Sequence, residues 1–185
     1  MKRSLRKAFE MSHSTEKHRA EAPRKLRFGV FICSTSRYMK YREGVKVEDE
    51  SGDLMEKLII KFGHSVSFRK LLPDDKALIE ESLKEVLNSD VDVVVFCGGT
   101  GIASSDLTIE TISPFMEKNL PGFGEIFRFL SYKRIGSAAV LSRASAGVSK
   151  GKVLFCIPGS PEAVSLCFEK LILPEAAHIV KHARE

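Results

Sequence analysis

Hydrophobic residues occur along the chain in two alternating patterns. Short apolar runs rich in β-branched residues predict buried strands, whereas apolar positions three and four apart predict amphipathic helices. The predicted strands are residues 26–33, 64–72, 91–97, 135–141 and 152–157, and the predicted helices are residues 53–62, 76–88, 105–118, 163–171 and 174–182. Strands that alternate with helices are typical of a three-layer α/β/α domain around a mostly parallel sheet.

Loops of small, hydroxyl-bearing and glycine residues follow the predicted strands. Since ligands of open parallel sheets bind at the carboxyl ends of strands, these loops together predict a phosphate or nucleotide site. Arg37 in the first loop is either an anion contact or a solvated loop charge, and the polar residues 39–50 predict a surface excursion. The five loops are residues 34–37, 73–75, 98–106, 142–147 and 158–161.

The glycine loop, residues 98–106, begins with Gly98-Gly99-Thr100-Gly101. Glycine lets a ligand approach the main chain closely, and the N-terminus of the helix predicted next favours a phosphate. A carboxylate at Asp106 is compatible with a phosphate only if a cation lies between them, and Mg²⁺ is the usual one. The simpler interpretation is a tight turn in which Asp106 only caps the helix. In the same way, either Asp74 or Asp75 caps the helix that follows the second strand.

Composition bounds the size of the domain. A chain of 185 residues with 43% hydrophobic and 29% charged residues fits one folded unit. Residues 1–25 hold eight Lys and Arg against three Asp and Glu, which supplies the whole net charge of +5, because the remainder holds 21 of each. We therefore expect a basic, flexible tail over residues 1–25, a single domain over residues 26–185 and no nucleic-acid surface on that domain.

The cysteines and the apolar runs bear on location. The sequence has no apolar run long enough to cross a membrane and no signal-peptide core at its N-terminus. No Cys-x-x-Cys pair occurs. We therefore interpret the cysteines as small buried hydrophobic side chains in a reducing compartment, in preference to metal ligands or disulfide partners. We expect a cytoplasmic protein that does not bind a membrane. The four cysteines are Cys33, Cys97, Cys156 and Cys167.

The segment over residues 121–132 is rich in aromatic residues and predicts a helix after an irregular start. At about 100° per residue, Phe127 and Phe129 point to sides about 160° apart. A single narrow core stripe cannot hold both rings. The segment is therefore either a lid or a contact between subunits, with ordinary core as the alternative.

Four motifs occur in order and with fitting gaps between residues 26 and 173. They resemble the MoaB and MogA family of molybdenum cofactor biosynthesis proteins, and the gephyrin G domain is similar. Ser36-Arg37 stands where active bacterial members often carry Asp-Arg, and some stretches look more like MoaB than MogA. The motifs are Gly98-Gly99-Thr100-Gly101 with Asp106 and Thr108, Pro121-Gly122-Phe123-Gly124-Glu125 with Arg128, Leu141-Ser142-Arg143, and Pro158-Gly159-Ser160-Pro161.

The resemblance implies a molybdopterin adenylyltransferase. Such an enzyme uses Mg²⁺ and ATP to adenylylate the terminal phosphate of molybdopterin and releases pyrophosphate; molybdopterin–AMP then passes to a MoeA-like protein that inserts molybdate. The resemblance also implies a homotrimer or homohexamer, with Asp74 and Asp106 as the catalytic, metal-holding residues. Residues implied to bind the substrates are Gly98, Gly99, Thr100, Gly101, Ser104, Thr108, Ser142, Arg143, Ser145, Pro158, Gly159 and Ser160.

Two other functions remain open from the sequence. A non-catalytic, MoaB-like protein would bind molybdopterin or act as a scaffold; some MoaB members have glutamate at the place of Asp74, and its retention here argues for catalysis. A nucleotide-binding regulator would use the basic tail on nucleic acid, and the neutral domain argues against it. No Ser-His-Asp arrangement is indicated, so acyl-transfer hydrolysis is not expected.

Overall fold

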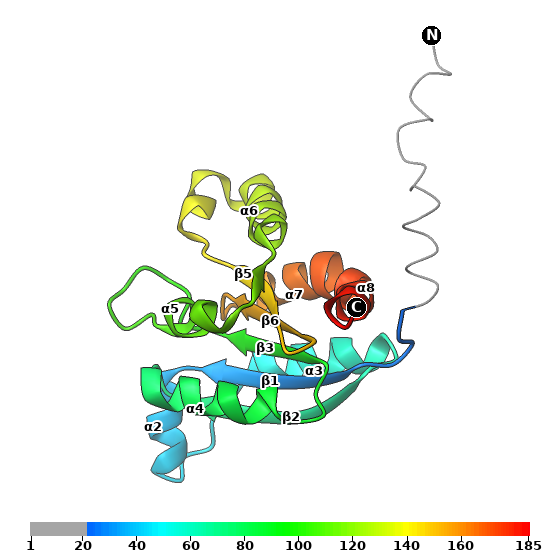
Figure 1. Cartoon of the computed structure of the whole chain (residues 1–185). Helices are drawn as coiled ribbons and strands as arrows, with labels where there is room; N and C mark the ends of the chain where they lie inside the picture. The colour runs from blue at the N-terminus through cyan, green and yellow to red at the C-terminus, as the bar shows by residue number, and fades with distance from the viewer. Residues whose placement is uncertain (1–21) are drawn as a thin grey trace.

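The computed structural model describes residues 22–185, so most of the predicted tail, including any flexibility it has, lies outside the described residues. Six strands form one sheet in the order β2-β1-β3-β6-β5-β4 (Figure 1). Neighbouring strands from β2 to β6 run parallel, whereas β5 is antiparallel to both β6 and β4. The predicted α/β fold with a mostly parallel sheet is confirmed.

Strands and helices alternate along most of the chain. The strands are β1 Arg27–Cys33, β2 Ser65–Leu72, β3 Val93–Cys97, β4 Lys118–Asn119, β5 Ser145–Ser149 and β6 Lys152–Ile157. The α-helices are α2 Thr35–Arg42, α3 Glu50–Lys61, α4 Lys76–Leu87, α5 Thr108–Ile112, α6 Pro121–Ile135, α7 Pro161–Cys167 and α8 Leu173–Ala183. Two 3₁₀-helices, η1 Ser113–Phe115 and η2 Gly136–Leu141, and one π-helix, η3 Phe168–Ile172, complete the described elements.

Each face of the sheet has its own apolar core. Strand β1 shows the cause, because successive side chains of a strand point to opposite faces. Val30 and Ile32 join one core, whereas Phe31 and Cys33 join the other. The second core lies under α4 and α5 and includes Ile79 and other buried residues of α4.

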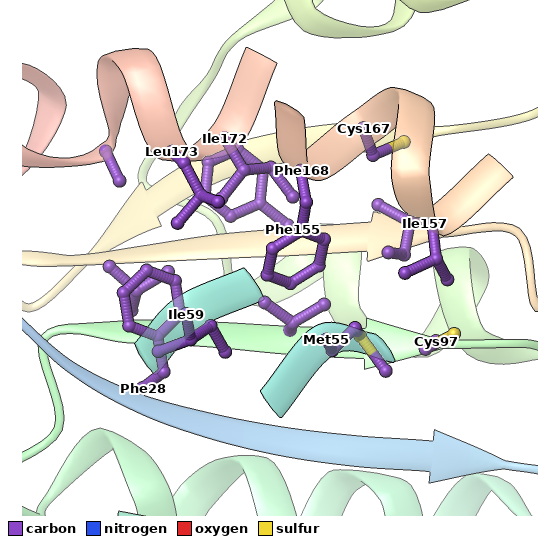
Figure 2. Packing of buried hydrophobic residues seen from close by; sticks show 14 of the residues in the cluster. Phe28, Met55, Ile59, Cys97, Phe155, Ile157, Cys167, Phe168, Ile172 and Leu173 are labelled. Carbon is purple, nitrogen blue, oxygen red and sulfur yellow. The ribbon is translucent and has the colours of Figure 1, made fainter. Parts of the chain in front are cut away.

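The larger core lies under α3 and the continuous segment from α7 to α8. Figure 2 shows Met55 and Ile59 of α3 on the same side of the sheet as Phe155 of β6 and Phe168 of η3. All four side chains are almost fully buried. Burial of each contributes about 1.5–3 kcal/mol to folding, so this layer fixes the strands whose ends carry the site.

The strand predicted over residues 135–141 is wrong. Gly136 adopts a φ of +62° and ends α6, and the apolar run continues as η2. Val140 and Leu141 are exposed, so this run does not enter the sheet. The position beside β6 is taken instead by β5, where the sequence predicted a loop. Lys150 and Gly151 both have positive φ and form the two-residue turn that joins β5 to β6 as a hairpin.

Two helices also differ from the prediction. Residues 35–42 form α2 where the sequence predicted a loop and an excursion; none of its residues is buried, so it lacks the apolar periodicity of a packed helix. The helix predicted over residues 105–118 is limited to α5. Pro114, at the start of η1, has no amide hydrogen to continue the helical bonding.

Two observations on the described residues concern membrane-spanning helices and the state of the cysteines. None of the helices within residues 22–185 is long and apolar enough to cross a membrane. All four cysteines are free and buried, as expected for side chains that serve as small hydrophobes.

Asp92, just before β3, is a buried carboxylate at the amino-terminal edge of the sheet. It accepts hydrogen bonds from the backbone N–H of Arg27 at 2.7 Å and from the guanidinium of Arg184 at 2.6 Å. Burial by itself raises the pKa of Asp92, but these hydrogen bonds outweigh burial and hold the pKa below its usual value. The carboxylate thus joins the start of β1 and the end of α8 to the central strand.

We expect Asp92→Ala to lower the free energy of unfolding by about 1.5–3 kcal/mol, because it leaves the Arg27 N–H without its charged acceptor. The loss should be full above about pH 4, the usual carboxyl pKa of the unfolded chain, and should shrink as pH falls through the depressed folded-state pKa. Urea unfolding of parent and variant at several pH values measures this. The control is Asp90→Ala, whose side chain is 95% exposed; equal stability of the two variants would show that the buried contacts do not contribute.

Candidate active site

The loops after β1, β2, β3 and β6 meet at the carboxyl edge of the sheet. A cleft of about 350 Å³ opens there between the glycine loop, the segment after η2 and the loop after β6. Most of the residues that the sequence assigns to substrate binding are therefore brought together. The cleft is lined by Gly98, Gly99, Thr100, Gly101, Asp106, Leu141, Ser142, Arg143, Pro158 and Gly159.

The glycine loop begins with a turn that requires glycine. Gly98 has a φ of +106° and Gly99 a φ of +61°, which L side chains rarely adopt. A Cβ atom at Gly98 would collide with the backbone carbonyl oxygen of Cys33 at the end of β1. The Gly98 N–H donates a hydrogen bond of 3.0 Å to the carbonyl oxygen of Ile157 at the end of β6. The start of the loop therefore lies between the ends of β1 and β6, the two strands that flank β3.

Asp74 follows β2 and lies beside the glycine loop. Its Oδ2 accepts hydrogen bonds from the N–H and the hydroxyl of Thr35, both at 2.9 Å. Its Oδ1 is buried and makes no hydrogen bond within the described part of the chain. A Cβ atom at Gly99 would lie 2.7 Å from this oxygen, so Oδ1 faces the glycine loop. Asp75, and not Asp74, caps α4 by accepting a hydrogen bond from the Leu78 N–H.

Two further oxygen atoms face the same loop. The Thr108 hydroxyl is buried against Gly99 and, within residues 22–185, has no hydrogen-bond partner. Asp106 Oδ2 accepts a hydrogen bond of 2.9 Å from the Ala103 N–H and would lie 2.6 Å from a Cβ atom at Gly101. Asp106 is not a helix cap, since α5 starts at Thr108. The helix behind the loop is short, since α5 covers only Thr108–Ile112.

These oxygen atoms fit a hard cation. A buried carboxylate oxygen without a donor is costly unless a positive charge meets it. Asp74 and Asp106 approach Gly99 and Gly101 of the same loop, and Mg²⁺ is commonly held by one or two carboxylates plus substrate phosphates. No group of three or more ligating side chains gathers among the described residues.

Arg143 braces the glycine loop from the far side of the cleft. Its Nε donates a hydrogen bond of 3.1 Å to the carbonyl oxygen of Thr100, and its two terminal nitrogens bind both carboxylate oxygens of Glu110. The hydrogen bond from Arg143 lowers the pKa of Glu110, and the same bond raises the pKa of Arg143. Both groups are therefore charged near neutral pH. Arg143 lines the cleft as predicted, but most of its donors hold the loop and α5 in place.

Three of the predicted binding residues lie away from the centre of the cleft. Ser104 is exposed in the glycine loop and is not part of the lining. Ser145 lies within β5, opposite Cys156 of β6. Ser160 caps α7 through the Ala163 N–H and lines a neighbouring hollow instead.

The sequence reasoning missed several supporting residues. Thr35 orients Asp74, a contact that no local pattern could reveal because it joins loops after two different strands. Ser51 in the first turn of α3 donates a hydrogen bond of 2.8 Å to the carbonyl oxygen of Gly159. Asp49 caps α3 and pairs with Arg37 at 3.2 Å, so Arg37 already has an anionic partner. The Asp49 cap before an apolar run was a readable helix-start signal.

No buried thiol is available as a nucleophile at this edge. Cys33 lies at the end of β1, and burial raises its pKa to about 12. Burial also raises the pKa of Cys97 at the end of β3. Both side chains are therefore protonated near neutral pH.

Comparison with known proteins fits this geometry. The family model for the "Probable molybdopterin binding domain" of molybdenum cofactor biosynthesis matches residues 29–178. The chain belongs to this family. Its resemblance to MoaB and MogA is thereby confirmed, and the matched range covers every strand-end loop of the cleft. The family was thus correctly predicted from the four motifs.

Relatives and solved structures agree along nearly the whole chain. Molybdenum cofactor biosynthesis protein B of Bacillus subtilis is 42% identical over 174 residues, which cover 93% of this chain and 98% of the relative. Molybdopterin adenylyltransferase of Pyrococcus furiosus is 44% identical over 174 residues, covering 92% and 98%. The crystal structure of the tungsten cofactor synthesizing protein MoaB from Pyrococcus furiosus matches with a TM-score of 0.78 at 43% identity, covering 89% of this chain and all of the other.

We expect Gly98→Ala to lower the free energy of unfolding by about 3 kcal/mol, because the new Cβ meets a backbone carbonyl in addition to the positive φ. Gly44→Ala is the matched control. Gly44 has a φ of +77° but nothing within 4 Å of an added Cβ, so its cost should be limited to about 1–2 kcal/mol. Chemical unfolding measures both variants, and equal losses would contradict the close approach of Gly98 to β1.

Proposed function

We propose that this chain is a molybdopterin adenylyltransferase, which transfers AMP from ATP to the terminal phosphate of molybdopterin. The observation that carries the proposal is the buried Oδ1 of Asp74, which makes no hydrogen bond within residues 22–185 and faces the glycine loop. The same loop holds Asp106, whose Oδ2 would lie 2.6 Å from a Cβ atom at Gly101, and a triphosphate beside both carboxylates would be repelled without a cation. The relative from Pyrococcus furiosus carries the name of this activity.

The proposed reaction does not need a strong general base from the protein. A phosphate oxygen of molybdopterin attacks the α-phosphorus of ATP, a new P–O bond forms, and the bond from the α-phosphorus to the bridging oxygen breaks. Pyrophosphate leaves with the electron pair. A phosphate monoester is already largely ionised near pH 7, so the protein must chiefly position the two substrates and neutralise their charge.

The chain provides positioning through its loops. Gly98, Gly99, Thr100 and Gly101 line the cleft, so the backbone of the glycine loop lies where phosphate oxygens would bind. Asp74 and Asp106 would hold Mg²⁺, which when bound offsets phosphate charge and polarises the phosphoryl oxygens. Thr35 fixes Asp74 through two hydrogen bonds, and Arg143 fixes the loop at Thr100.

A second hollow gives room for the other substrate. It has a volume of about 310 Å³, lies between α6 and α7, and shares Ser142 and Pro158 with the main cleft. Ser160 and Arg134 also line it and offer a hydroxyl and a cation. We propose that the two hollows together hold ATP and molybdopterin, and that molybdopterin–AMP then passes to a MoeA-like partner in the cytoplasm.

Asp74→Asn should lower turnover by about 10²-fold or more, because it removes the charge from the oxygen that faces the glycine loop. The asparagine oxygen can still accept the hydrogen bonds from Thr35, so the loop should stay in place. Asp75→Asn is the matched control, since that neighbouring residue only caps α4. The assay follows molybdopterin–AMP formation from Mg-ATP and molybdopterin. Equal activity of the two variants would contradict a metal role for Asp74.

Asp106→Ala should abolish adenylylation and leave molybdopterin binding largely intact, because the pterin itself needs no cation. Equilibrium binding of molybdopterin and the same turnover assay separate the two effects. A parent protein that binds molybdopterin tightly but forms no molybdopterin–AMP would instead identify a carrier or scaffold. Full activity in Asp106→Ala would remove Asp106 from the metal site.

We further propose a homotrimer or homohexamer that uses the outer face of α6 and η2. Phe127 is 2% exposed and packs in the core, whereas Phe129 on the opposite side of α6 is 57% exposed. Other large apolar side chains of α6 and η2 are also exposed, namely Ile126, Tyr132, Ile135, Val140 and Leu141. Large exposed apolar patches mark interaction sites.

Phe129→Asp should shift the assembly to smaller species, because an unpaired charge in an apolar contact costs several kcal/mol, about 2–7. Light scattering coupled to size-exclusion chromatography measures the mass. Ile60→Asp on α3, at a side chain 59% exposed, is the control and should keep the parent mass. A parent that is monomeric at micromolar concentration would contradict the proposal, and an oligomer that survives Phe129→Asp would place the contact elsewhere.

A further inference from the structure

Glu110, in the first turn of α5, does not line the cleft but is joined to the glycine loop through Arg143. Its two carboxylate oxygens accept hydrogen bonds from the two terminal nitrogens of Arg143. The Nε of the same guanidinium donates a hydrogen bond of 3.1 Å to the carbonyl oxygen of Thr100. Arg143 therefore ties the start of the glycine loop to the helix that follows the loop.

Asp106, the loop carboxylate at the proposed metal position, lies in the chain between the two ends of this tie. Its Oδ2 would lie 2.6 Å from a Cβ atom at Gly101, the residue after Thr100, and accepts a hydrogen bond from the Ala103 N–H. Residues 102–105 are exposed, and the loop between β3 and α5 extends beyond the end of the strand in Figure 1. Packing therefore contributes little to holding this part of the loop, and the place of the carboxylate depends on the backbone that Arg143 holds.

Glu110 sets the orientation of the Arg143 guanidinium. A guanidinium presents its donors in a rigid planar fork, so a carboxylate that binds both terminal nitrogens fixes the direction of the whole group. With the terminal nitrogens on Glu110, the Nε is left directed at the Thr100 carbonyl. The Arg143 side chain is 33% exposed, so without Glu110 it would be free to turn toward solvent or into the cleft.

We propose that Glu110 is a positioning residue of the candidate active site: through Arg143 and Thr100 it holds the glycine loop so that Asp106 meets the metal ion. This role rests on the proposed function, because it presupposes a cation at Asp74 and Asp106. Arg143, which the sequence motif places among the substrate-binding residues, then acts on the substrates through the loop that it holds. Glu110 itself touches neither the substrates nor the ion.

A salt bridge with only a structural role would behave differently. The side chain of Glu110 is 51% exposed, and ion pairs at such exposure contribute little to folding stability. Loss of the pair should therefore leave the melting temperature nearly unchanged. Loss of a residue that supports a metal ligand, by contrast, weakens metal binding by about 10–100-fold. Metal-dependent binding of a nucleotide therefore distinguishes the two roles.

Calorimetric titration of the full chain with α,β-methylene-ATP, once in MnCl₂ and once in EDTA, tests the proposal. The ratio of the two dissociation constants reports how much the metal ion adds to nucleotide affinity. Glu110→Gln leaves one acceptor oxygen beside an amide group that only donates, so this ratio should fall by about tenfold or more. Arg143→Lys keeps the charge but loses the planar fork and should lower the ratio to a similar extent. The double variant should lose no more than either single variant, because both residues act through one tie.

Glu85→Gln is the matched control and should keep the parent ratio, since Glu85 pairs with Lys70 at 3.2 Å and neither residue lines the cleft. The proposal is overturned if Glu110→Gln keeps the parent ratio, or if the double variant shows the product of the two single effects. A melting temperature that falls further in Glu110→Gln than in the control would also overturn it, because the clamp would then stabilise the whole domain.

Nucleotide binding by the parent that does not depend on the metal ion would likewise overturn the positioning role. The outcome for the proposed function is separate, because the titration does not depend on turnover. A parent that binds the metal ion and nucleotide as expected but forms no molybdopterin–AMP would contradict the proposed activity and leave the role of Glu110 in metal binding in place.

Discussion

The candidate site depends on the close approach of Gly98 to the end of β1. Strand β3 is central in the parallel part of the sheet, and its chain must turn out between the ends of β1 and β6. A side chain at Gly98 would strike the Cys33 carbonyl, and the turn is tied to β6 through Ile157. Once this turn is set, Gly99 comes to lie against Asp74 and Thr108. The backbone of the glycine loop thus shapes the surroundings of two carboxylates, Asp74 from the loop after β2 and Asp106 at its own end.

Asp74 and Asp75 differ in their hydrogen-bond partners, and the difference distinguishes a structural residue from a candidate functional one. Asp75 accepts a hydrogen bond from the Leu78 N–H and caps α4, which accounts for its presence. Asp74 has one oxygen satisfied by Thr35 and one buried oxygen that no group in residues 22–185 satisfies. Folding alone would favour replacing such a group, because burial of an unpaired polar atom is unfavourable. This buried oxygen is the basis for the cation proposed at Asp74.

Much of the fold was readable from the sequence because buried strands and packed helices leave clear apolar patterns. The predicted positions of β1, β2, β3 and β6 are correct to within two residues. The apolar pattern did not predict α2 or β5. Helix α2 has no buried residue, and β5 consists largely of small residues, so neither element has the run of large apolar side chains that marks a packed helix or strand. The motifs identified most of the cleft, but the bond of Thr35 to Asp74 and the clamp of Arg143 on Glu110 join residues distant in sequence. Only the assembled sheet brings them together.

The Arg143 clamp has a consequence for how copies of the chain would influence one another. Arg143 follows η2, and its guanidinium grips both Thr100 and Glu110. The exposed apolar face of α6 and η2 ends two residues before it, at Leu141. In the proposed oligomer, a neighbour bound at this face would also contact the segment that leads to Arg143, which holds Thr100 of the glycine loop. Association of copies and binding of substrate at the proposed site would then be thermodynamically linked, so that each would favour the other.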